Sequence, residues 1–210
     1  MSTDTPRTDG PDASPAPHLE KARLRTGLLA ARDAMSPFIL SQSIAELAEW
    51  MYRLPVELAP GDTVAAYVAT RREPGGIAML DALADQGLRV ILPIVPEGEP
   101  DRLQWGVYTD ERELEPGRWN LLEPMGQRLD PDTLVQAELI LVPAVAVDRR
   151  GVRLGRGAGY YDRTLAGMRA PIVAVVHDAE VVDAPLPEDE NDVRVNLILT
   201  PGAGFTPVDG

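Results

Sequence analysis

The sequence predicts an α/β fold, namely a single-domain, three-layer, Rossmann-like sandwich with a mainly parallel sheet. Two observations lead to this prediction. Short apolar runs typical of buried strands alternate with segments of helical periodicity, and strands separated by helices usually pair in parallel. The chain has 210 residues, of which 44% are hydrophobic, and this is enough for one core of ordinary size.

The first half of the chain predicts two helices followed by a β-α-β unit. Ser36 followed by Pro37 is typical of an N-cap and the first turn of a helix. The expected elements are a helix at 19–35, a helix from 37 to about 53, a strand at 63–69, a helix at 77–86 closed by Gly87, and a strand at 88–94.

The second half predicts further strands around a glycine-rich turn. The expected elements are a strand at 103–108, a loop at 115–132, a strand at 139–142 that feeds the turn, a helix at 159–168, and strands at 172–176 and 193–199. We expect a disordered, proline-rich tail at 1–17, a folded domain at 18–204 and a frayed end at 205–210.

The most informative segment is 139–165, LILVPAVAVDRRGVRLGRGAGYYDRTL, which concentrates arginine in a chain of net charge −13. Gly155, Gly157 and Gly159 allow positive φ and close approach of amides to an anion, and a helix beginning near Gly159 favours the same anion. The spacing is not a dinucleotide fingerprint, because Tyr160 replaces the third small residue, and no P-loop motif occurs. The turn predicts a phosphate or carboxylate site, with a structural turn bearing solvated arginines as the alternative.

Composition excludes several other classes of function. The chain contains no cysteine, which excludes cysteine nucleophiles and thiolate zinc sites. The net negative charge disfavours binding to nucleic acid or to anionic membranes. The sequence shows neither a signal peptide nor an apolar run long enough to cross a bilayer. We therefore expect a cytoplasmic monomer that binds small ligands.

A few polar residues outside this segment are candidates for specific roles. Lys21 is the only lysine among 20 basic residues, and Arg25 follows one helical turn later, so both are expected on one helix face. A compact ammonium suits a triphosphate, although a solvated lysine retained by chance is an equal alternative. His177 ends an apolar run, where a hydrogen-bonded histidine at a strand end is expected rather than a catalytic one.

Together these features resemble the 5-formyltetrahydrofolate cyclo-ligase family, also called methenyltetrahydrofolate synthetases. The segment DRRGVRLGRGAGYYDRTL is similar to the family motif F-D-x-x-G-x-R-L-G-x-G-x-G-Y-Y-D, and LPEDENDVRV is similar to a late acidic element of the family. The resemblance extends from about Leu19 to Pro201. The other similarities are Lys21 with Arg25, Leu92 with Pro93, and Trp119 with Glu123-Pro124.

The resemblance implies an enzyme that uses ATP and Mg²⁺ to cyclise 5-formyltetrahydrofolate, free or polyglutamylated, to 5,10-methenyltetrahydrofolate, with release of ADP and phosphate. Phosphorylation of the formyl oxygen would turn a poor leaving group into a good one. Such a transfer depends mainly on positioning and charge neutralisation, and it requires neither histidine nor cysteine.

The resemblance also implies roles for individual residues, with Lys21 and Arg156 as the catalytic ones. The implied ATP contacts are Lys21, Arg25, Arg153, Gly155, Arg156, Gly157, Gly159 and Tyr160; the implied folate contacts are Val68, Glu73, Trp119, Arg156 and Tyr160; the implied Mg²⁺ ligands are Asp162 and Asp192. Without the resemblance, Trp119 could be a loop anchor packed on the core, Glu73 a solvated acid, and Asp192 a turn or cap residue.

Three positions depart from the family pattern. Glu73 is followed by Pro-Gly-Gly, Val147 stands where phenylalanine is usual, and Ala158 stands where glycine or a basic residue is usual. Alanine contributes no charge and disfavours positive φ, so nucleotide geometry or affinity is expected to differ from that of the family. Two other functions stay open: a folate- or nucleotide-binding module without turnover, and an ATP-dependent enzyme with another small substrate.

Overall fold

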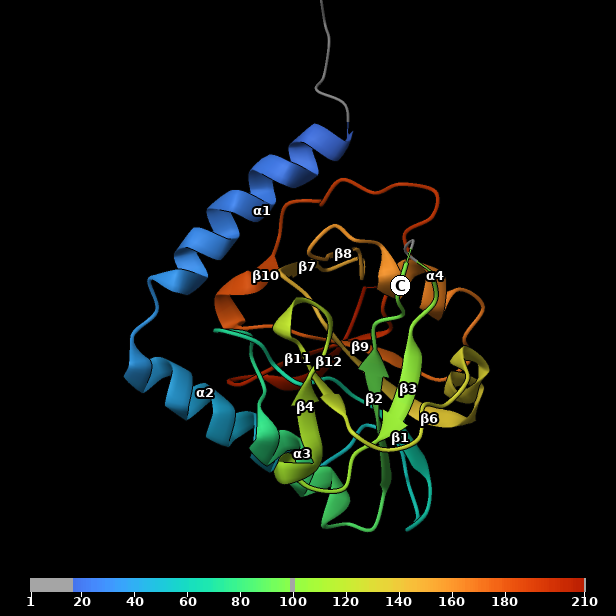
Figure 1. The fold of residues 1–210 in the computed structure, drawn as a ribbon. Helices are drawn as coiled ribbons and strands as arrows, with labels where there is room; N and C mark the ends of the chain where they lie inside the picture. The colour runs from blue at the N-terminus through green and yellow to red at the C-terminus, as the bar shows by residue number, and fades with distance from the viewer. Residues whose placement is uncertain (1–16, 99–100, 210) are drawn as a thin grey trace, which may run out of the picture.

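The computed structural model describes residues 17–98 and 101–209 and shows a central sheet with helices beside it (Figure 1). Of the predicted tail at 1–17, residues 1–16 lie outside the described residues, and Pro17 begins a helix instead. The helices are α1 (Pro17–Asp33), α2 (Pro37–Trp50), α3 (Ile77–Ala84) and α4 (Tyr160–Leu165). Short 3₁₀ helices are Glu111–Glu113, Arg118–Asn120, Pro131–Gln136 and Asp178–Glu180.

The central sheet has the strand order β12-β11-β9-β6-β1-β2-β3. Its inner pairs are parallel, and the edge strands β12 and β3 run antiparallel to their neighbours. The prediction of an α/β fold with a mainly parallel sheet is confirmed. The strands are β1 (Thr63–Ala65), β2 (Arg89–Ile94), β3 (Gln104–Val107), β6 (Ala137–Pro143), β9 (Ile172–Val175), β11 (Leu197–Thr200) and β12 (Gly204–Pro207).

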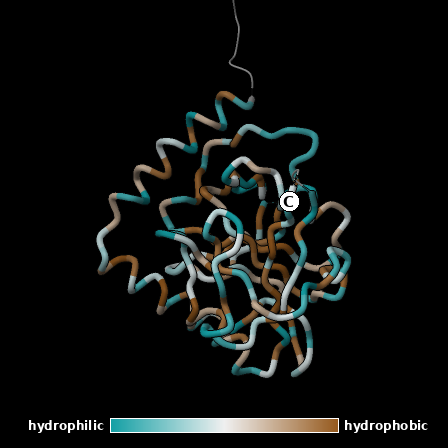
Figure 2. Tube along the Cα trace, viewed as in Figure 1, coloured by the Kyte–Doolittle hydropathy of each residue, from teal (hydrophilic) through white to brown (hydrophobic). Residues whose placement is uncertain are grey.

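Both faces of the sheet are apolar, which explains why its strands read as continuous hydrophobic runs. Along β6, Leu139 and Leu141 pack in a cluster with residues of α2 and α3, whereas Ile140 and Val142 pack in a second cluster with residues of α4. This alternation follows from the two-residue period of a strand. Figure 2 shows the hydrophobic segments gathered at the centre of the molecule.

The long helix α1 lies at the side of the molecule, beside a second small sheet (Figure 1). This sheet has the order β10-β7-β8, with β7 at Ala146–Asp148, β8 at Arg153–Leu154 and β10 at Val181–Val182. Leu24 and Leu28 of α1 pack against its cluster of buried residues. No helix in the described ranges is both long enough and apolar enough to cross a membrane.

Several predicted boundaries are wrong, because the strands concerned are too short to show a period in the sequence. The predicted strand at 63–69 ends at Ala65, and the one at 193–199 begins only at Leu197. The predicted loop at 115–132 contains the hairpin of β4 (Leu114–Pro116) and β5 (Leu122–Pro124). The predicted frayed end contains most of β12, which closes the sheet edge, and β7, β8 and β10 were not predicted.

The strand order places β1 and β6 side by side at the point where the chain changes direction. From β1 the sheet continues through β2 to β3 on one side, and from β6 it continues through β9 to β11 on the other. Ligands of open parallel sheets bind outside the carboxyl ends of the strands at such a point. Glu73 follows β1, and the glycine turn follows β6 after the β7–β8 hairpin, so this edge of the sheet is where a site is expected.

Candidate active site

Two of the three glycines of the turn adopt the positive φ that the sequence predicts, whereas Gly155 does not. Gly157 and Gly159 have φ of 102° and 70°, whereas Ala158 is not among the residues with positive φ. The backbone at Ala158 therefore gives no reason to expect an altered nucleotide geometry. Gly159 is the N-cap of α4, which ends at Leu165 and is shorter than the predicted helix at 159–168. Such a short helix has a small dipole and offers an anion less stabilisation than the predicted longer helix.

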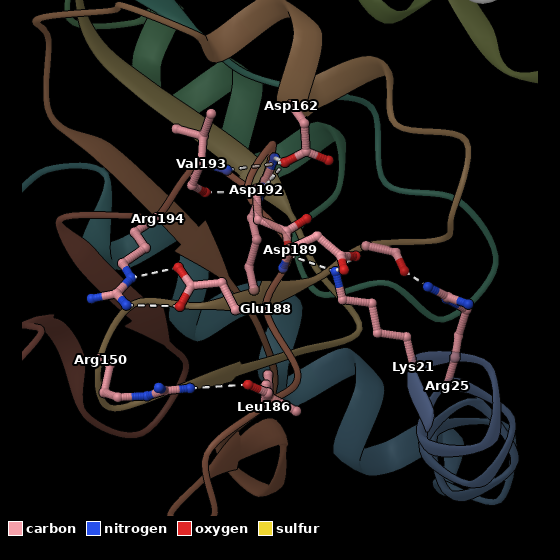
Figure 3. A network of polar contacts seen from close by, with 12 residues as sticks. Lys21, Arg25, Arg150, Asp162, Leu186, Glu188, Asp189, Asp192, Val193 and Arg194 are labelled. Carbon is pink, nitrogen blue, oxygen red and sulfur yellow. Dashed lines mark hydrogen bonds and ion pairs between the residues drawn. The ribbon is translucent and has the colours of Figure 1, made fainter. Parts of the chain in front are cut away.

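Two cations of α1 reach the loops around this turn (Figure 3). Arg25 Nε donates to the carbonyl of Gly155 at 2.7 Å. Lys21 Nζ lies 2.6 Å from Asp189 Oδ2 and 2.5 Å from Asp192 Oδ2. The two side chains come from one helical turn and lie against segments more than 100 positions later in the chain. The structure therefore brings together Lys21, Arg25, the glycine turn and Asp192, as predicted.

The surroundings of Lys21 keep its ammonium charged. Burial by itself lowers the pKa of Lys21, but the hydrogen bonds to Asp189 and Asp192 outweigh it and raise the pKa above the usual value for lysine. The ammonium is therefore held in its charged form between two carboxylates. Because Asp192 Oδ2 also accepts the amide of Asp189 at 2.8 Å, the turn role considered for Asp192 coexists with the ion pair.

Arg153 points into the protein rather than toward the open side of the turn. Its side chain is 4% exposed, and it donates through both terminal nitrogens to Asp162 Oδ1 at 2.8–2.9 Å and to the carbonyl of Val193 at 3.0 Å. Burial lowers the pKa of Arg153, and the nearby carboxylates of Asp162 and Asp192 oppose this shift. The geometry favours a role in orienting Asp162 over the predicted direct contact with ATP.

Asp162 and Asp192 lie close together, because the amide of Val193 donates to Asp162 Oδ1 at 3.3 Å. One oxygen of each carboxylate, Oδ2 of Asp162 and Oδ1 of Asp192, accepts no hydrogen bond from the described part of the chain. Across residues 17–98 and 101–209, no group of three acidic or histidine residues is placed to hold a metal ion. Mg²⁺ at phosphate-transfer sites uses one or two carboxylates together with phosphate oxygens and water. The pair therefore fits a Mg²⁺ that arrives with a phosphate, and does not form an all-protein site.

Glu73 and Arg156 form an ion pair beside this region. Arg156 Nε lies 2.8 Å from Glu73 Oε1, and the amide and hydroxyl of Thr70 donate to Glu73 Oε2 at 2.7 and 2.8 Å. The side chain of Glu73 is only 7% exposed, so the alternative of a solvated acid is wrong. Val68, also predicted to touch the folate, is half-buried against the core cluster that includes α2 and α3.

Trp119 is exposed to solvent over 60% of its surface, so the alternative of a loop anchor packed on the core is wrong. Its ring lies edge-on to Tyr160 with centroids 5.9 Å apart, and the guanidinium of Arg118 stacks over it at 4.5 Å. Tyr160 is buried, and Arg163 covers its ring at 5.3 Å. A flat, solvent-exposed ring beside a tyrosine is suited to stacking on a planar ligand.

The histidine and the second tyrosine behave as ordinary structural residues. His177 Nε2 lies 3.0 Å from the carbonyl of Arg72, to which it donates, and Nδ1 lies 3.2 Å from the hydroxyl of Ser43. The prediction of a hydrogen-bonded histidine at a strand end is confirmed. Tyr161 packs against the second core cluster, and burial raises its pKa above the usual value for tyrosine.

Sequence reasoning missed Arg118, Thr70 and Asp189, which all contact predicted site residues. Asp189 could have been suspected, because it lies in the same acidic segment as Asp192. Arg118 carried only the weak signal of standing next to Trp119, and nothing in the sequence singled out Thr70. A groove of about 440 Å³ between α1 and α2 has none of the predicted ligand contacts among its lining residues.

Comparison with known proteins gives a consistent result. The model of the 5-formyltetrahydrofolate cyclo-ligase family matches residues 17–201. A 5-formyltetrahydrofolate cyclo-ligase of Mycolicibacterium smegmatis is 42% identical over 190 residues, which cover 88% of this chain and 95% of that protein. The protein of the same name from Escherichia coli is 31% identical over 150 residues, which cover 70% of this chain and 81% of that protein.

Solved structures show the same fold. The NMR structure of 5,10-methenyltetrahydrofolate synthetase from Aquifex aeolicus superimposes with a TM-score of 0.74 at 29% identity, covering 90% of this chain and 94% of that one. The structure of a 5,10-methenyltetrahydrofolate synthetase from Mycoplasma pneumoniae, at 21% identity and a TM-score of 0.67, supports the fold alone.

Proposed function

The chain belongs to the 5-formyltetrahydrofolate cyclo-ligase family and is an enzyme of that family, and on this premise we propose that it converts 5-formyltetrahydrofolate to 5,10-methenyltetrahydrofolate with ATP and Mg²⁺. One observation carries the proposal: α1 docks Lys21 and Arg25 against the glycine turn and the segment that contains Asp192. Positioned cations, backbone amides and carboxylates are the groups that phosphoryl transfer requires.

The proposed reaction has two steps. The formyl oxygen attacks the γ-phosphorus of ATP, and the bond from this phosphorus to the leaving oxygen of ADP breaks. N10 then attacks the activated formyl carbon, the C–O bond breaks, and phosphate departs with the former formyl oxygen. N10 loses its proton to solvent, which leaves the methenyl bridge between N5 and N10.

The chain's own residues would act by charge and position. Lys21 would leave Asp189 and Asp192 for the phosphates, while Arg25 and the amides of the glycine turn neutralise further negative charge. Asp162 and Asp192 would hold the Mg²⁺ that accompanies ATP, and this ion would supply further neutralisation of phosphate charge.

On the folate side, the Glu73–Arg156 pair and Trp119 would bind the substrate. Glu73 would accept hydrogen bonds from ring N–H groups, Trp119 would stack on a ring, and Val68 would contact its apolar edge. Arg156 and Tyr160 lie on the glycine turn and at the start of α4, so they would face both substrates. We further propose that the enzyme acts as a cytoplasmic monomer on free or polyglutamylated folate.

The test is a coupled measurement of methenyl absorbance and ADP release. We expect both signals only when 5-formyltetrahydrofolate, ATP and Mg²⁺ are all present, in a ratio of one to one. Lys21→Ala should lower turnover by at least about tenfold, the factor that corresponds to 1.4 kcal/mol. Arg23→Ala, a loss of charge at an exposed position on the same helix, is the matched control and should change it little.

Two results would contradict the proposal. Folate binding without ADP release would favour a module that has lost turnover, and ADP release with other acceptors only would favour a different substrate. Ala158 was one reason to consider a binding module without turnover, but this residue does not need a positive φ. The altered Glu73-Pro-Gly-Gly loop also keeps Glu73 paired with Arg156.

A further inference from the structure

Arg118 stands at the centre of the aromatic part of the site, where no role has been assigned to it. Its Nη1 lies 3.2 Å from the hydroxyl oxygen of Tyr160, 2.9 Å from the carbonyl of Pro96 and 3.0 Å from that of Gly98. The same guanidinium stacks over the ring of Trp119 at 4.5 Å. One side chain therefore links three segments that are distant in the sequence.

The backbone at Trp119 is in an unfavourable conformation. Trp119 has φ of 56° and the following Asn120 has φ of 59°, and positive φ is rare for bulky residues. The turn is closed by the amide of Gly117, which donates to Leu121 at 2.7 Å. Conformations of this kind persist only where the surroundings impose them, and they are common at ligand sites. The stacking of Arg118 on the indole ring is one such restraint.

Arg118 also decides the direction of the Tyr160 hydroxyl. A guanidinium only donates hydrogen bonds, so the Tyr160 oxygen must be the acceptor in this contact. No group in the described ranges accepts the proton of that hydroxyl, which can therefore be donated to a ligand. Tyr160 further contacts Trp119 edge-on, so the two aromatic rings and Arg118 form one unit.

We propose that Arg118 is a positioning residue for the folate substrate: it holds Trp119 in a conformation ready to stack and directs the hydroxyl proton of Tyr160 toward the bound ligand. This inference rests on the proposed function, because it assumes that Trp119 and Tyr160 touch the folate. It assigns Arg118 to substrate binding, with no part in the phosphate contacts of Lys21 and Arg25.

The test compares Arg118→Ala and Arg118→Lys with Arg112→Ala, which removes an exposed arginine from the adjacent 3₁₀ helix. The Kd for 5-formyltetrahydrofolate, measured by calorimetry without ATP, should rise about tenfold in Arg118→Ala, equivalent to 1.4 kcal/mol. The KM for ATP should rise by a clearly smaller factor, because Trp119 faces the folate alone whereas Tyr160 faces both substrates. Arg118→Lys should recover only part of the loss, since it retains a donor but not the planar stack. Arg112→Ala should behave as the unmodified protein.

A double-mutant cycle separates positioning from general stability. If Arg118 acts through Tyr160, the loss of Arg118 should raise the Kd by a smaller factor in Tyr160→Phe than in the unmodified protein. Equal rises in the folate Kd and the ATP KM, or an unchanged folate Kd, would overturn the inference. Absence of turnover with a folate Kd that still depends on Arg118 would refute the proposed function and leave the inference intact. Absence of folate binding by the unmodified protein would refute both.

Discussion

Ion pairing decides which single side chains of the site remain available to a ligand. The arginines at 149, 150, 153 and 156 each face a carboxylate, so most of the positive charge of the segment 139–165 is neutralised internally. Arg25 and Arg163 instead donate to backbone carbonyls and have no carboxylate partner among the described residues. Among the described arginines around the turn, those without a carboxylate partner therefore come from α1 and α4.

Asp192 and Asp189 offer a direct test of the proposed metal ligand, since both pair with Lys21. We expect Asp192→Asn to raise the Mg²⁺ concentration for half-maximal activity by about tenfold or more, because the substitution removes a charged oxygen ligand. Asp189→Asn should leave this requirement within about twofold, while still weakening the hold on Lys21. Activity measured across a Mg²⁺ titration at saturating ATP distinguishes the two variants. Equal increases in the Mg²⁺ requirement would argue against Asp192 as the metal ligand.

The lowered pKa of Asp148 predicts that the stability of the protein falls at acid pH. Burial alone raises the pKa of this carboxyl, but the amides of Leu186 and Val152 and the side chain of Arg150 together lower it below the usual value. A depressed pKa in the folded state stabilises the protein above the unfolded value of about 3.9, and this contribution is lost as the pH falls through the folded value.

We therefore expect Asp148→Asn to reduce the pH dependence of unfolding. The difference in free energy of unfolding between about pH 7 and about pH 3.5 should be smaller in the variant than in the unmodified protein. Urea denaturation at both pH values measures it. Asp183→Asn is the control, because Asp183 is highly exposed in its pair with Arg149. An unchanged difference would assign the acid sensitivity to other carboxylates.

At the scale of elements, α1 is held by few contacts, yet it carries two of the predicted ATP contacts. In the described part of the chain, Leu24 and Leu28 are the α1 residues that pack against a core cluster, that of the small sheet. Its firmest attachment is the buried pair of Arg32 with Glu180, at 2.6–2.7 Å, and a hydrogen bond from Arg32 to the carbonyl of Ala144 at 2.8 Å. Burial alone lowers the pKa of Arg32, but the hydrogen bond with Glu180 outweighs it and raises the pKa.

Removing one partner of this pair should be costly. Arg32→Ala leaves Glu180 buried without its cation, and we expect a loss of about 3–5 kcal/mol in the free energy of unfolding. The double variant Arg32→Met with Glu180→Leu should recover most of the loss, because no uncompensated charge remains. Denaturant unfolding of both variants measures this. If the double variant is as unstable as the single one, packing rather than charge accounts for the effect.

At the scale of the whole molecule, the candidate site is assembled from segments throughout the chain. α1, the loop after β1, the β4–β5 hairpin, the glycine turn and the segment 189–192 all contribute. A ligand that contacts several of these segments at once should stabilise the folded state, because it binds only when they are assembled. The metal would arrive with the ligand, since no three-residue metal group occurs in the described ranges.

We accordingly expect Mg²⁺ and ATP together to raise the thermal midpoint. At about 100 times the Kd, binding stabilises the folded state by about 2.7 kcal/mol, which corresponds to a shift of about 5–10 °C for a chain of this size. A chelator alone should leave the midpoint of the ligand-free protein unchanged. Differential scanning calorimetry measures the midpoint under both conditions. A large drop of the midpoint with the chelator would instead reveal a resident structural metal.

The sequence by itself determined the fold class and most members of the candidate site. Apolar runs bury both faces of a parallel sheet, so they could be recognised locally, and the glycine turn carries its chemistry within one continuous segment. The prediction of Ser36 as an N-cap is confirmed for the same reason, because its hydroxyl accepts the amide of Ile39 only three residues away. The three-layer, single-domain description and the residue roles remain predictions.

Only the tertiary structure decided the partners of the charged residues. Lys21 meets Asp189 and Asp192 across more than 160 positions, and Arg156 meets Glu73 across 83. No local pattern encodes such pairs, because they depend on how α1 and the loops pack around the sheet. The strand β12 and the small sheet were also decided by the tertiary structure, because their strands are too short to show a period. Arg118 likewise gains its partners only when the β4–β5 hairpin folds beside α4.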